Sequence, residues 1–365
     1  MYISIDNNDK HNGSPIKNHW KGVLLVISLV SLHKKVNPIN YSVKNICGLE
    51  EYAMRINCTI EFSMVLDGDK FYKLLIKASD KNSHMEENGE ESIDRSLAQK
   101  GVTAIYRDSQ YKKKVRILAD LGMVLKDGHD TEQSIRKLDK RIIEYFGFRY
   151  KLDDCTISGL MLTADIDVGN HEKVAAYLKV LRRIGKIKGF SLSDYDCFEE
   201  GESFCLDGNS NGIRFRIYDL ESLLKRQLQR IDMGKKKVKS VAREAQGILR
   251  AEVQLTKQKA VRVYADASDV SGQIAELSIK CQDIFMDTFA HIIPFGDFYK
   301  MDKAVEIVRK EVTDTVLRRK MLRLLTLIPE KKSLYLAQMA MSCRNIEKVM
   351  DMFAKSNCSA SPMKR

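Results

Sequence analysis

Three segments in the middle of the chain alternate apolar and polar positions with a period of two, the pattern of a β-strand that turns one face to a core. The segments are residues 160–168, 213–219 and 248–255. Their polar positions carry Thr163, Asp165 and Asp167, then Arg214, Arg216 and Tyr218, and finally Arg250, Glu252 and Gln254. If the three strands share a sheet, its open face gathers these charged side chains.

The first third of the chain shows weaker strand patterns. Strands are predicted at residues 23–32, 55–65, 71–76 and within 101–125. An Asp67-Gly68-Asp69 turn before residues 71–76 indicates a hairpin. The acidic stretch 80–96 is rich in Asn, Ser and Gly and is predicted to be an exposed loop, and residues 1–20 to be a flexible leader.

Helical spacing of apolar residues predicts helices at 131–146 and 171–187. Residues 203–206 and the strand at 213–219 flank a turn with Asn211-Gly212, which indicates a hairpin. From residue 270 to 355 the pattern is helical, with breaks at Pro294 and Pro329.

These elements predict an α+β fold, in which an antiparallel-sheet domain with packed helices is followed by an all-helical C-terminal region. The expected domains are an α+β domain at 21–268, a helical domain at 269–355 and a disordered tail at 356–365. The last two predicted helices, 331–341 and 345–353, have the spacing of a helix-turn-helix, although any small helical bundle has it too.

The chain is basic, with 61 Lys and Arg against 49 Asp and Glu and a net charge of +12. Such a charge favours a polyanionic partner, nucleic acid first and an anionic membrane surface second. The one long apolar run, residues 23–32, is too short to span a bilayer, which needs roughly twenty residues. The eight cysteines form no Cys-x-x-Cys pair, which suits reduced thiols in a cytoplasmic protein.

Carboxylates at strand spacing are suitable ligands for Mg²⁺ or Mn²⁺, and such an ion polarises a phosphodiester. Arg214, Arg216 and Arg250 could hold the flanking phosphates. The alternative is an ordinary solvated face of an antiparallel sheet. No phosphate-binding loop, nucleophile elbow or His-x-x-x-His zinc pattern occurs in the sequence.

Residues 220–246 are predicted to be a strongly basic helix. Its cations include Lys225, Arg226, Lys235, Lys236, Lys237 and Lys239. A contact with the DNA backbone and a solvated helix face explain the run equally well.

Several short motifs resemble those of the rolling-circle replication initiators of small plasmids and filamentous phages. The resemblance spans roughly residues 135 to 265. Its motifs are Arg-Ile-Ile-Glu-Tyr-Phe-Gly-Phe at 141–148, Leu-Thr-Ala-Asp-Ile-Asp-Val at 162–168, Arg-Ile-Tyr-Asp at 216–219 and Leu-Arg-Ala-Glu-Val-Gln-Leu at 249–255. Each motif is short, and their order and spacing carry the resemblance.

The resemblance implies an enzyme that nicks one strand of origin DNA, keeps the 5′ phosphate on a tyrosine and needs a divalent cation, Mg²⁺ or Mn²⁺. It makes Asp165 and Glu252 the first candidate metal ligands, with Asp167 as a neighbour and Asp219 at a strand end. Origin DNA, single- and double-stranded, is the implied partner. A host helicase and a second copy of the chain are further candidates. The competing hypothesis is a basic DNA-binding regulator without catalysis.

Tyr264 is the first candidate nucleophile, since it follows Glu252 by twelve residues, enough for a turn and about two helical turns back across the sheet. Arg262 and Lys259 could stabilise its phenolate. Tyr218, on the polar face itself, is the second candidate. Packing of Tyr264 with Val261 and Val263 is the simpler alternative.

Overall fold

The structure is a computed structural model, and it describes most of the chain between residues 56 and 360. The described ranges are 56–81, 85–88, 91–110, 112–125, 131–147, 150–185, 187, 189–193, 201–208, 210–230, 240, 242–293, 299–341, 346–356 and 358–360. The predicted leader, the predicted strand at 23–32 and Lys235, Lys236, Lys237 and Lys239 lie outside these ranges.

The chain forms two compact units, and neither is a single stretch of sequence. Unit 1 contains residues 56–163 and 254–284, and unit 2 contains 164–253 and the residues from 285 onward. The fold is α+β, as predicted, with strands that pair antiparallel and helices that dominate the C-terminal part. The predicted domain boundary near residue 268 stays a prediction.

The strands of unit 1 lie in the order β2-β3-β4-β5-β1-β6. They are β1 (Asn57–Leu66), β2 (Met85–Asn88), β3 (Glu91–Asp94), β4 (Val102–Asp108), β5 (Lys113–Asp120) and β6 (Thr156–Asp167). The last residues of β6, from Ala164 onward, belong to unit 2. The alternation along β1 buries Ile60 and Phe62 completely. β1 pairs with both β5 and β6, so it lies in the interior of the sheet.

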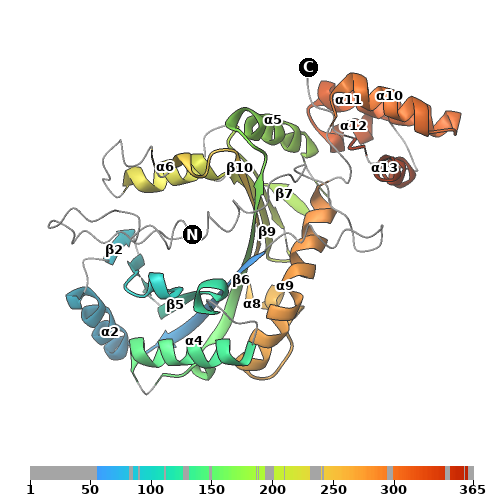
Figure 1. Cartoon of the computed structure of the whole chain (residues 1–365). Coiled ribbons are helices and arrows are strands. Elements are labelled where there is room, and N and C mark those ends of the chain that lie inside the picture. The colour runs from blue at the N-terminus through green and yellow to red at the C-terminus, as the bar shows by residue number, and fades with distance from the viewer. Residues whose placement is uncertain are drawn as a thin grey trace. The chain divides into compact units, whose positions relative to one another are not determined.

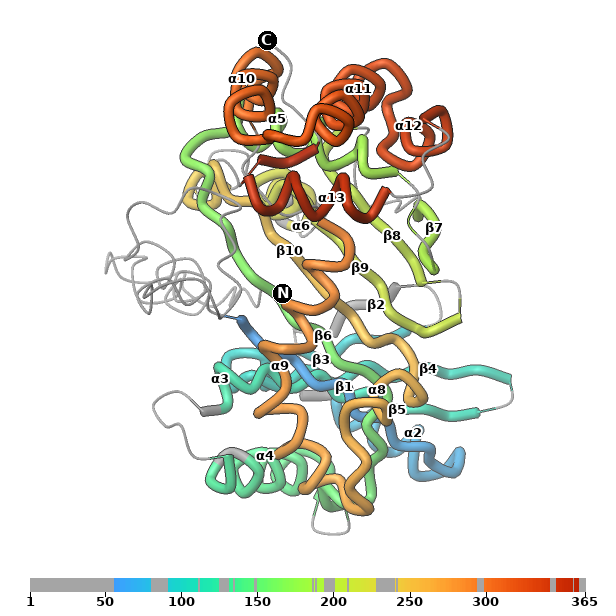
Figure 2. Tube along the Cα trace, turned by 90° about the vertical axis from the view of Figure 1, so that its right-hand side faces the viewer, coloured from blue at the N-terminus to red at the C-terminus, as the bar shows by residue number. Residues whose placement is uncertain are grey.

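Helices of unit 1 pack on this sheet (Figure 2). They are α2 (Gly68–Lys81), α3 (Leu121–Leu125), α4 (Thr131–Phe146) and α8 (Gln258–Arg262), with the first part of α9 (Val270–Ile292) and the 3₁₀ turns η2 (Ala98–Lys100) and η3 (Leu152–Asp154). Tyr106 of β4 contacts both main helices. Its ring lies 5.8 Å from that of Phe71 in α2, and its hydroxyl lies 3.0 Å from that of Tyr145 in α4.

The strands of unit 2 follow the end of β6 in the order β10-β9-β8-β7. They are β7 (Phe190–Leu192), β8 (Ser203–Gly208), β9 (Ile213–Asp219) and β10 (Ile248–Leu255). The predicted hairpin is confirmed, since Ser203 of β8 pairs with Tyr218 of β9. Phe215 of β9 faces the last turns of α9, where its ring lies 5.8 Å from that of Phe289.

Unit 2 contains helices that directly follow strands of its sheet and a separate group of helices near the C-terminus (Figure 1). α5 (His171–Leu181) with the turn η4 (Arg182–Ile184), and α6 (Leu220–Arg230), follow strands of the sheet. α10 (Met301–Glu311), α11 (Thr315–Lys331), α12 (Leu334–Met341) and α13 (Ile346–Lys355) form a helical group with its own apolar core around Met321, Leu324 and Phe353. No helix within the described ranges is long and apolar enough to cross a membrane.

One predicted strand is wrong. Residues 71–76 belong to helix α2 and not to a hairpin. Phe71, Leu74 and Ala78 are buried at helical spacing, and the Asp67 carboxylate accepts a hydrogen bond from the Lys70 amide at the start of the helix. The side-chain cap and the three-and-four spacing outweigh the strand propensity of the run Phe-Tyr-Lys-Leu-Leu-Ile.

Three further predictions are corrected. The predicted acidic loop at 80–96 contains the paired strands β2 and β3, and Ile93 and Asp94 are buried. Pro329 does not break a helix, because it lies within the last turn of α11. The first residues of the predicted disordered tail are ordered, since Cys358 and Ala360 pack in the core of the helical group.

Candidate functional site

Five of the residues predicted to share a sheet face do share one. Asp165 of β6, Arg250 and Glu252 of β10, and Arg216 and Tyr218 of β9 lie on three neighbouring strands, because residues two apart on a strand point the same way. The sequence pattern suggested that this face is open to solvent, but in the structure it is covered. All five side chains are buried, with Tyr218 and Glu252 each 5% exposed. We call these residues the polar cluster.

Asp165 and Arg250 form a bidentate ion pair within the polar cluster. Arg250 Nε donates to Asp165 Oδ1 at 2.5 Å, and Nη2 donates to Oδ2 at 2.7 Å. Burial by itself lowers the pKa of a guanidinium, but the Asp165 charge outweighs it and the pKa of Arg250 lies above its usual value. Both oxygens of Asp165 therefore face a cation that the chain supplies itself.

Glu252 connects two residues of β9. Its Oε2 accepts a hydrogen bond from the Tyr218 hydroxyl at 3.1 Å, and its Oε1 lies 3.3 Å from Arg216 Nη1. Burial raises the pKa of Tyr218 well above its usual value, and the charge of Glu252 raises it further. Arg250 acts in the opposite direction on the same pKa. The phenol is therefore protonated at neutral pH, with a carboxylate placed to accept its proton.

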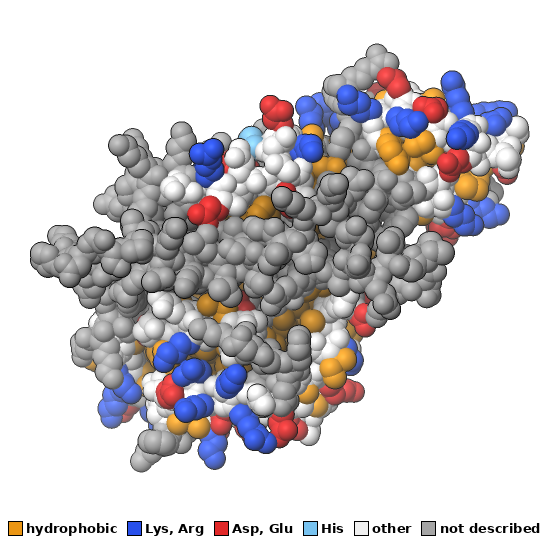
Figure 3. Space-filling model, viewed as in Figure 1, with side chains coloured by type: hydrophobic (Ala, Val, Ile, Leu, Met, Phe, Trp, Pro, Cys, Tyr) orange, Lys and Arg blue, Asp and Glu red, His pale blue; other side chains and the backbone are white. Residues whose placement is uncertain are grey.

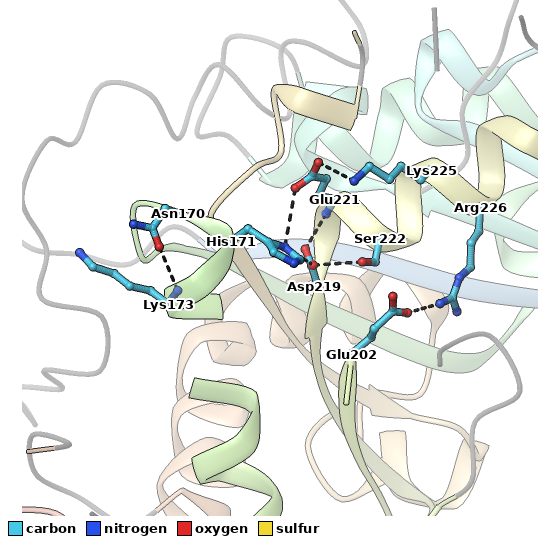
Figure 4. Close-up of polar contacts among 9 residues, drawn as sticks. All are labelled: Asn170, His171, Lys173, Glu202, Asp219, Glu221, Ser222, Lys225 and Arg226. Carbon is cyan, nitrogen blue, oxygen red and sulfur yellow. Dashed lines mark hydrogen bonds and ion pairs between the residues drawn. The ribbon is translucent and has the colours of Figure 1, made fainter. Parts of the chain in front are cut away.

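A second group of polar residues lies where β9 ends and α6 begins (Figure 4). Asp219 Oδ1 accepts from the Glu221 amide at 3.0 Å, as a helix N-cap does, and Oδ2 accepts from the Ser222 hydroxyl at 3.0 Å. His171, the first residue of α5, places Nδ1 3.4 Å from Asp219 Oδ2. Burial is the largest influence on Asp219 and raises the pKa of its carboxyl.

The partners of Asp219 were not predicted from the sequence. Glu221 and Ser222 could have been found, because an Asp followed by the start of a helix is an N-cap signature. His171 is distant in sequence and gives no such signal. It lies 4.0 Å from Glu221 Oε2 as well, so one imidazole approaches two carboxylates.

Gly247 links the ends of β6 and β10 beside this group. The Val168 amide donates to the Gly247 carbonyl at 2.8 Å. Gly247 has a φ of +82°, and a Cβ there would lie 2.7 Å from the Asn170 amide nitrogen. Only glycine suits that position, and through it the loop that begins α5 is fixed.

The other predicted contact residues are engaged elsewhere in unit 2. Asp167 is exposed, and its carboxylate accepts from the Gly169 amide at 2.8 Å. Arg214 pairs with Asp207 across the β8–β9 hairpin, and Arg226 pairs with Glu202. Lys225 pairs with Glu221 at 2.7 Å. Their roles in DNA binding stay predictions.

Tyr264 belongs to unit 1, where it follows α8 and is half-buried. Its carbonyl accepts a hydrogen bond from Lys280 Nζ at 2.6 Å. Tyr264 as nucleophile therefore stays a prediction, whereas Tyr218 lies in the polar cluster itself.

The carboxylates do not form a ready metal site. Among the described residues, no three His, Cys, Asp or Glu side chains are grouped so that they could hold a metal ion. Asp165 is held by Arg250, and Glu252 by Tyr218 and Arg216. Side chains already paired with cations are poor ligands for a further one.

Among the comparisons with known proteins, only the comparison with solved structures gives a match. No protein-family model matches the sequence, and no curated protein does. A solved structure of a rolling circle replication initiator protein from Geobacillus stearothermophilus matches at 12% identity over 72% of this chain and 90% of that chain, with a TM-score of 0.27.

Proposed function

We propose that this protein is a rolling-circle replication initiator that nicks and rejoins one strand of origin DNA through a covalent tyrosine intermediate. The observation that carries the proposal is the hydrogen bond from the Tyr218 hydroxyl to Glu252, set beside Arg216 and Arg250. A phenol, a carboxylate and guanidinium groups are what strand transfer needs: a nucleophile, a proton acceptor and cations for phosphate. The motif resemblance supports the same reaction.

In the proposed reaction the Tyr218 oxygen attacks the phosphorus of the scissile phosphodiester. The phenolic proton passes to Glu252 while the bond between phosphorus and the 3′ oxygen breaks. The leaving 3′ oxygen takes a proton from solvent water and becomes a hydroxyl, and the 5′ phosphate stays on the tyrosine. Rejoining is the reverse, with a 3′ hydroxyl attacking the phosphotyrosyl bond.

The burial and the ion pairs of the polar cluster determine which interactions must change when DNA binds. Burial keeps Tyr218 protonated, so transfer of its proton to Glu252 has to accompany the attack. A phosphate between Arg216 and Arg250 would compete with Glu252 and Asp165 for the guanidinium groups. Because the hydroxyl is buried, we expect DNA binding to expose it, and chain movement to precede the chemistry.

The described residues do not fit a divalent ion by themselves, and no step above passes through one. We propose that Mg²⁺ or Mn²⁺ joins the site only together with DNA, whose phosphate oxygens add ligands to one or two carboxylates of the set Asp165, Asp167, Asp219 and Glu252.

The test is formation of a covalent protein–DNA adduct. Internally ³²P-labelled DNA is incubated with the full chain and Mg²⁺ or Mn²⁺, and label that moves with denatured protein is measured. Tyr218→Phe is expected to abolish the adduct and Tyr264→Phe to preserve it. If only Tyr264→Phe fails to form the adduct, the nucleophile is Tyr264 and not Tyr218. Tight DNA binding with no adduct from the unsubstituted protein would favour the non-catalytic regulator.

A further inference from the structure

A basic surface with an exposed aromatic ring lies in unit 1, outside the polar cluster. It consists of Tyr72, Lys73, Ile76 and Lys77 on α2 and of Lys112 and Lys113 at the β4–β5 hairpin. We call it the Tyr72 surface. Figure 3 shows Lys and Arg side chains gathered at the lower left, over the part of unit 1 where Figure 1 labels α2, α4 and β5.

The Tyr72 ring is exposed but held in place. It is 41% exposed, and its hydroxyl donates to Asp108 at 2.5 Å. The ammonium of Lys113 lies 5.2 Å from the ring centroid, and the ring meets that of Phe71 edge to face at 5.4 Å. A ring fixed in this way loses little conformational entropy when a flat group stacks on it.

Exposed apolar and cationic side chains lie near Tyr72 along α2. Ile76, one turn further along α2, is 58% exposed. Lys73 and Lys77 are exposed and four residues apart, so they repel one another on the helix. Within the described residues, no ion pair neutralises Lys73, Lys77 or Lys112, whereas the neighbouring Lys70 and Lys113 are each paired with an aspartate. A polyanion bound along this surface would attract Lys73, Lys77 and Lys112 and offset the repulsion between the first two.

We propose that the Tyr72 surface binds single-stranded DNA, with a base stacked at Tyr72 and phosphates on Lys73, Lys77 and Lys112. Single strands offer both a flat apolar face and phosphates, and the surface has groups for both. Duplex DNA hides its bases in the stack, so it would engage the lysines and leave Tyr72 and Ile76 unused. This inference rests on the proposed function, in which the partner is DNA.

Nicking by strand transfer releases a single strand, and a surface outside the polar cluster could hold it. The proposal assigns that role to the Tyr72 surface. It requires no direct contact with Tyr218 or Glu252, so it can be tested by binding alone.

The test measures fluorescence anisotropy of a labelled oligothymidine with the full chain, in EDTA so that metal-dependent cleavage is absent. Tyr72→Ala is expected to weaken binding by roughly 5- to 150-fold, the range for loss of one stacked base. Tyr72→Phe keeps the ring and should bind almost as the unsubstituted protein does. A labelled duplex of equal length should bind Tyr72→Ala as tightly as it binds the unsubstituted protein.

The lysines are tested through the salt dependence of binding. Lys73→Gln/Lys77→Gln should flatten the slope of log affinity against log salt by about 1.4, since each phosphate contact on a single strand contributes about 0.7. Lys137→Gln/Lys140→Gln on α4 makes the same charge change in the same unit and should leave more of the slope intact. Equal flattening of the slope by both double variants would mean that DNA binds through the general positive charge of unit 1 and not through Lys73 and Lys77 in particular.

The outcomes separate this proposal from the proposed function. Oligothymidine affinity that is unchanged in Tyr72→Ala, or lost equally for the duplex, overturns the stacking surface even if the adduct forms. A selective loss in Tyr72→Ala from a protein that forms no adduct supports the surface and overturns the nicking reaction. Circular dichroism confirms that each variant is folded.

Discussion

The guanidinium of Arg250 and the carboxylate of Asp165 face one another along two parallel hydrogen bonds of 2.5 and 2.7 Å, with both side chains 3% exposed. Such a pair is costly to break from one side, because the remaining charge stays buried without its counterion. Arg250→Met should therefore lower the free energy of unfolding by about 3–5 kcal/mol. Urea denaturation measures this loss.

The double variant Asp165→Leu/Arg250→Met separates stability from chemistry. Replacing both charges with apolar groups of similar size is often neutral for folding. We expect the double variant to recover most of the stability lost in Arg250→Met and to form no DNA adduct. A stable double variant with full activity would show that the pair has a structural role only.

Glu252 is the proton acceptor in the proposed reaction, and its charge can be removed with little change in shape. Glu252→Gln should slow adduct formation by roughly 10²- to 10⁴-fold, the usual contribution of a general base. Glu202→Gln is the control, because Glu202 also pairs with an arginine of unit 2 but lies outside the polar cluster. An equal slowing in both variants would contradict the role of Glu252.

The sequence was sufficient to place the polar cluster on one sheet face but not to show that the face is buried. Alternation along a strand is local, so Asp165, Arg216, Tyr218 and Glu252 could be assigned to one side from their spacing. What covers that side depends on segments distant in sequence. For the same reason the pattern could not show that Asp165 is held by Arg250, a residue 85 positions away, before any metal could reach it.

Helix α2 was missed because two patterns compete in the same residues. The run Phe71-Tyr72-Lys73-Leu74-Leu75-Ile76 has strand composition, and only Asp67 before it and Ala78 after it reveal the helix. The opposite case is α4, where one apolar stripe and the following Gly147 predicted the element over its observed bounds. Long periodic elements are therefore predicted more securely than short apolar runs.

Tyr145 connects α4 to the sheet of unit 1 through a buried carboxylate. Its hydroxyl donates to Asp94, which is 1% exposed, and also contacts the Tyr106 hydroxyl. Tyr145→Phe removes that donor and should lower the free energy of unfolding by about 1.5–3 kcal/mol, the range for a hydrogen bond to a charged group. Tyr150→Phe is the control, since Tyr150 also packs against Phe146. Similar losses in both would point to ring packing.

Gly247 should tolerate no side chain. In Gly247→Ala the backbone would keep a φ of +82°, and the new Cβ would lie 2.7 Å from atoms of Gly169 and Asn170. We expect a loss of about 1–3 kcal/mol from the backbone conformation, and more from the clash. Gly68→Ala at the start of α2 is the matched control, because a Cβ there meets nothing within 4 Å. Thermal denaturation of the two variants tests the difference.

Asp219 should make the protein less stable as the pH rises through the acid range. Burial is the main reason that its pKa in the folded chain lies above the ordinary value of 3.8, so the folded protein holds this proton more tightly than the unfolded chain does. Its contribution to stability is therefore largest below pH 3.8 and is lost as the pH rises to the folded pKa.

Asp219→Asn has no proton to lose but retains an oxygen for the Glu221 amide and a polar partner for Ser222. Relative to the unsubstituted protein, this variant should gain stability as the pH rises across that window and show a constant difference above it. Urea denaturation at a series of pH values measures the difference. Opposite behaviour, with Asp219→Asn losing stability on rising pH, would mean that His171 and Ser222 stabilise the Asp219 carboxylate more than burial penalises it.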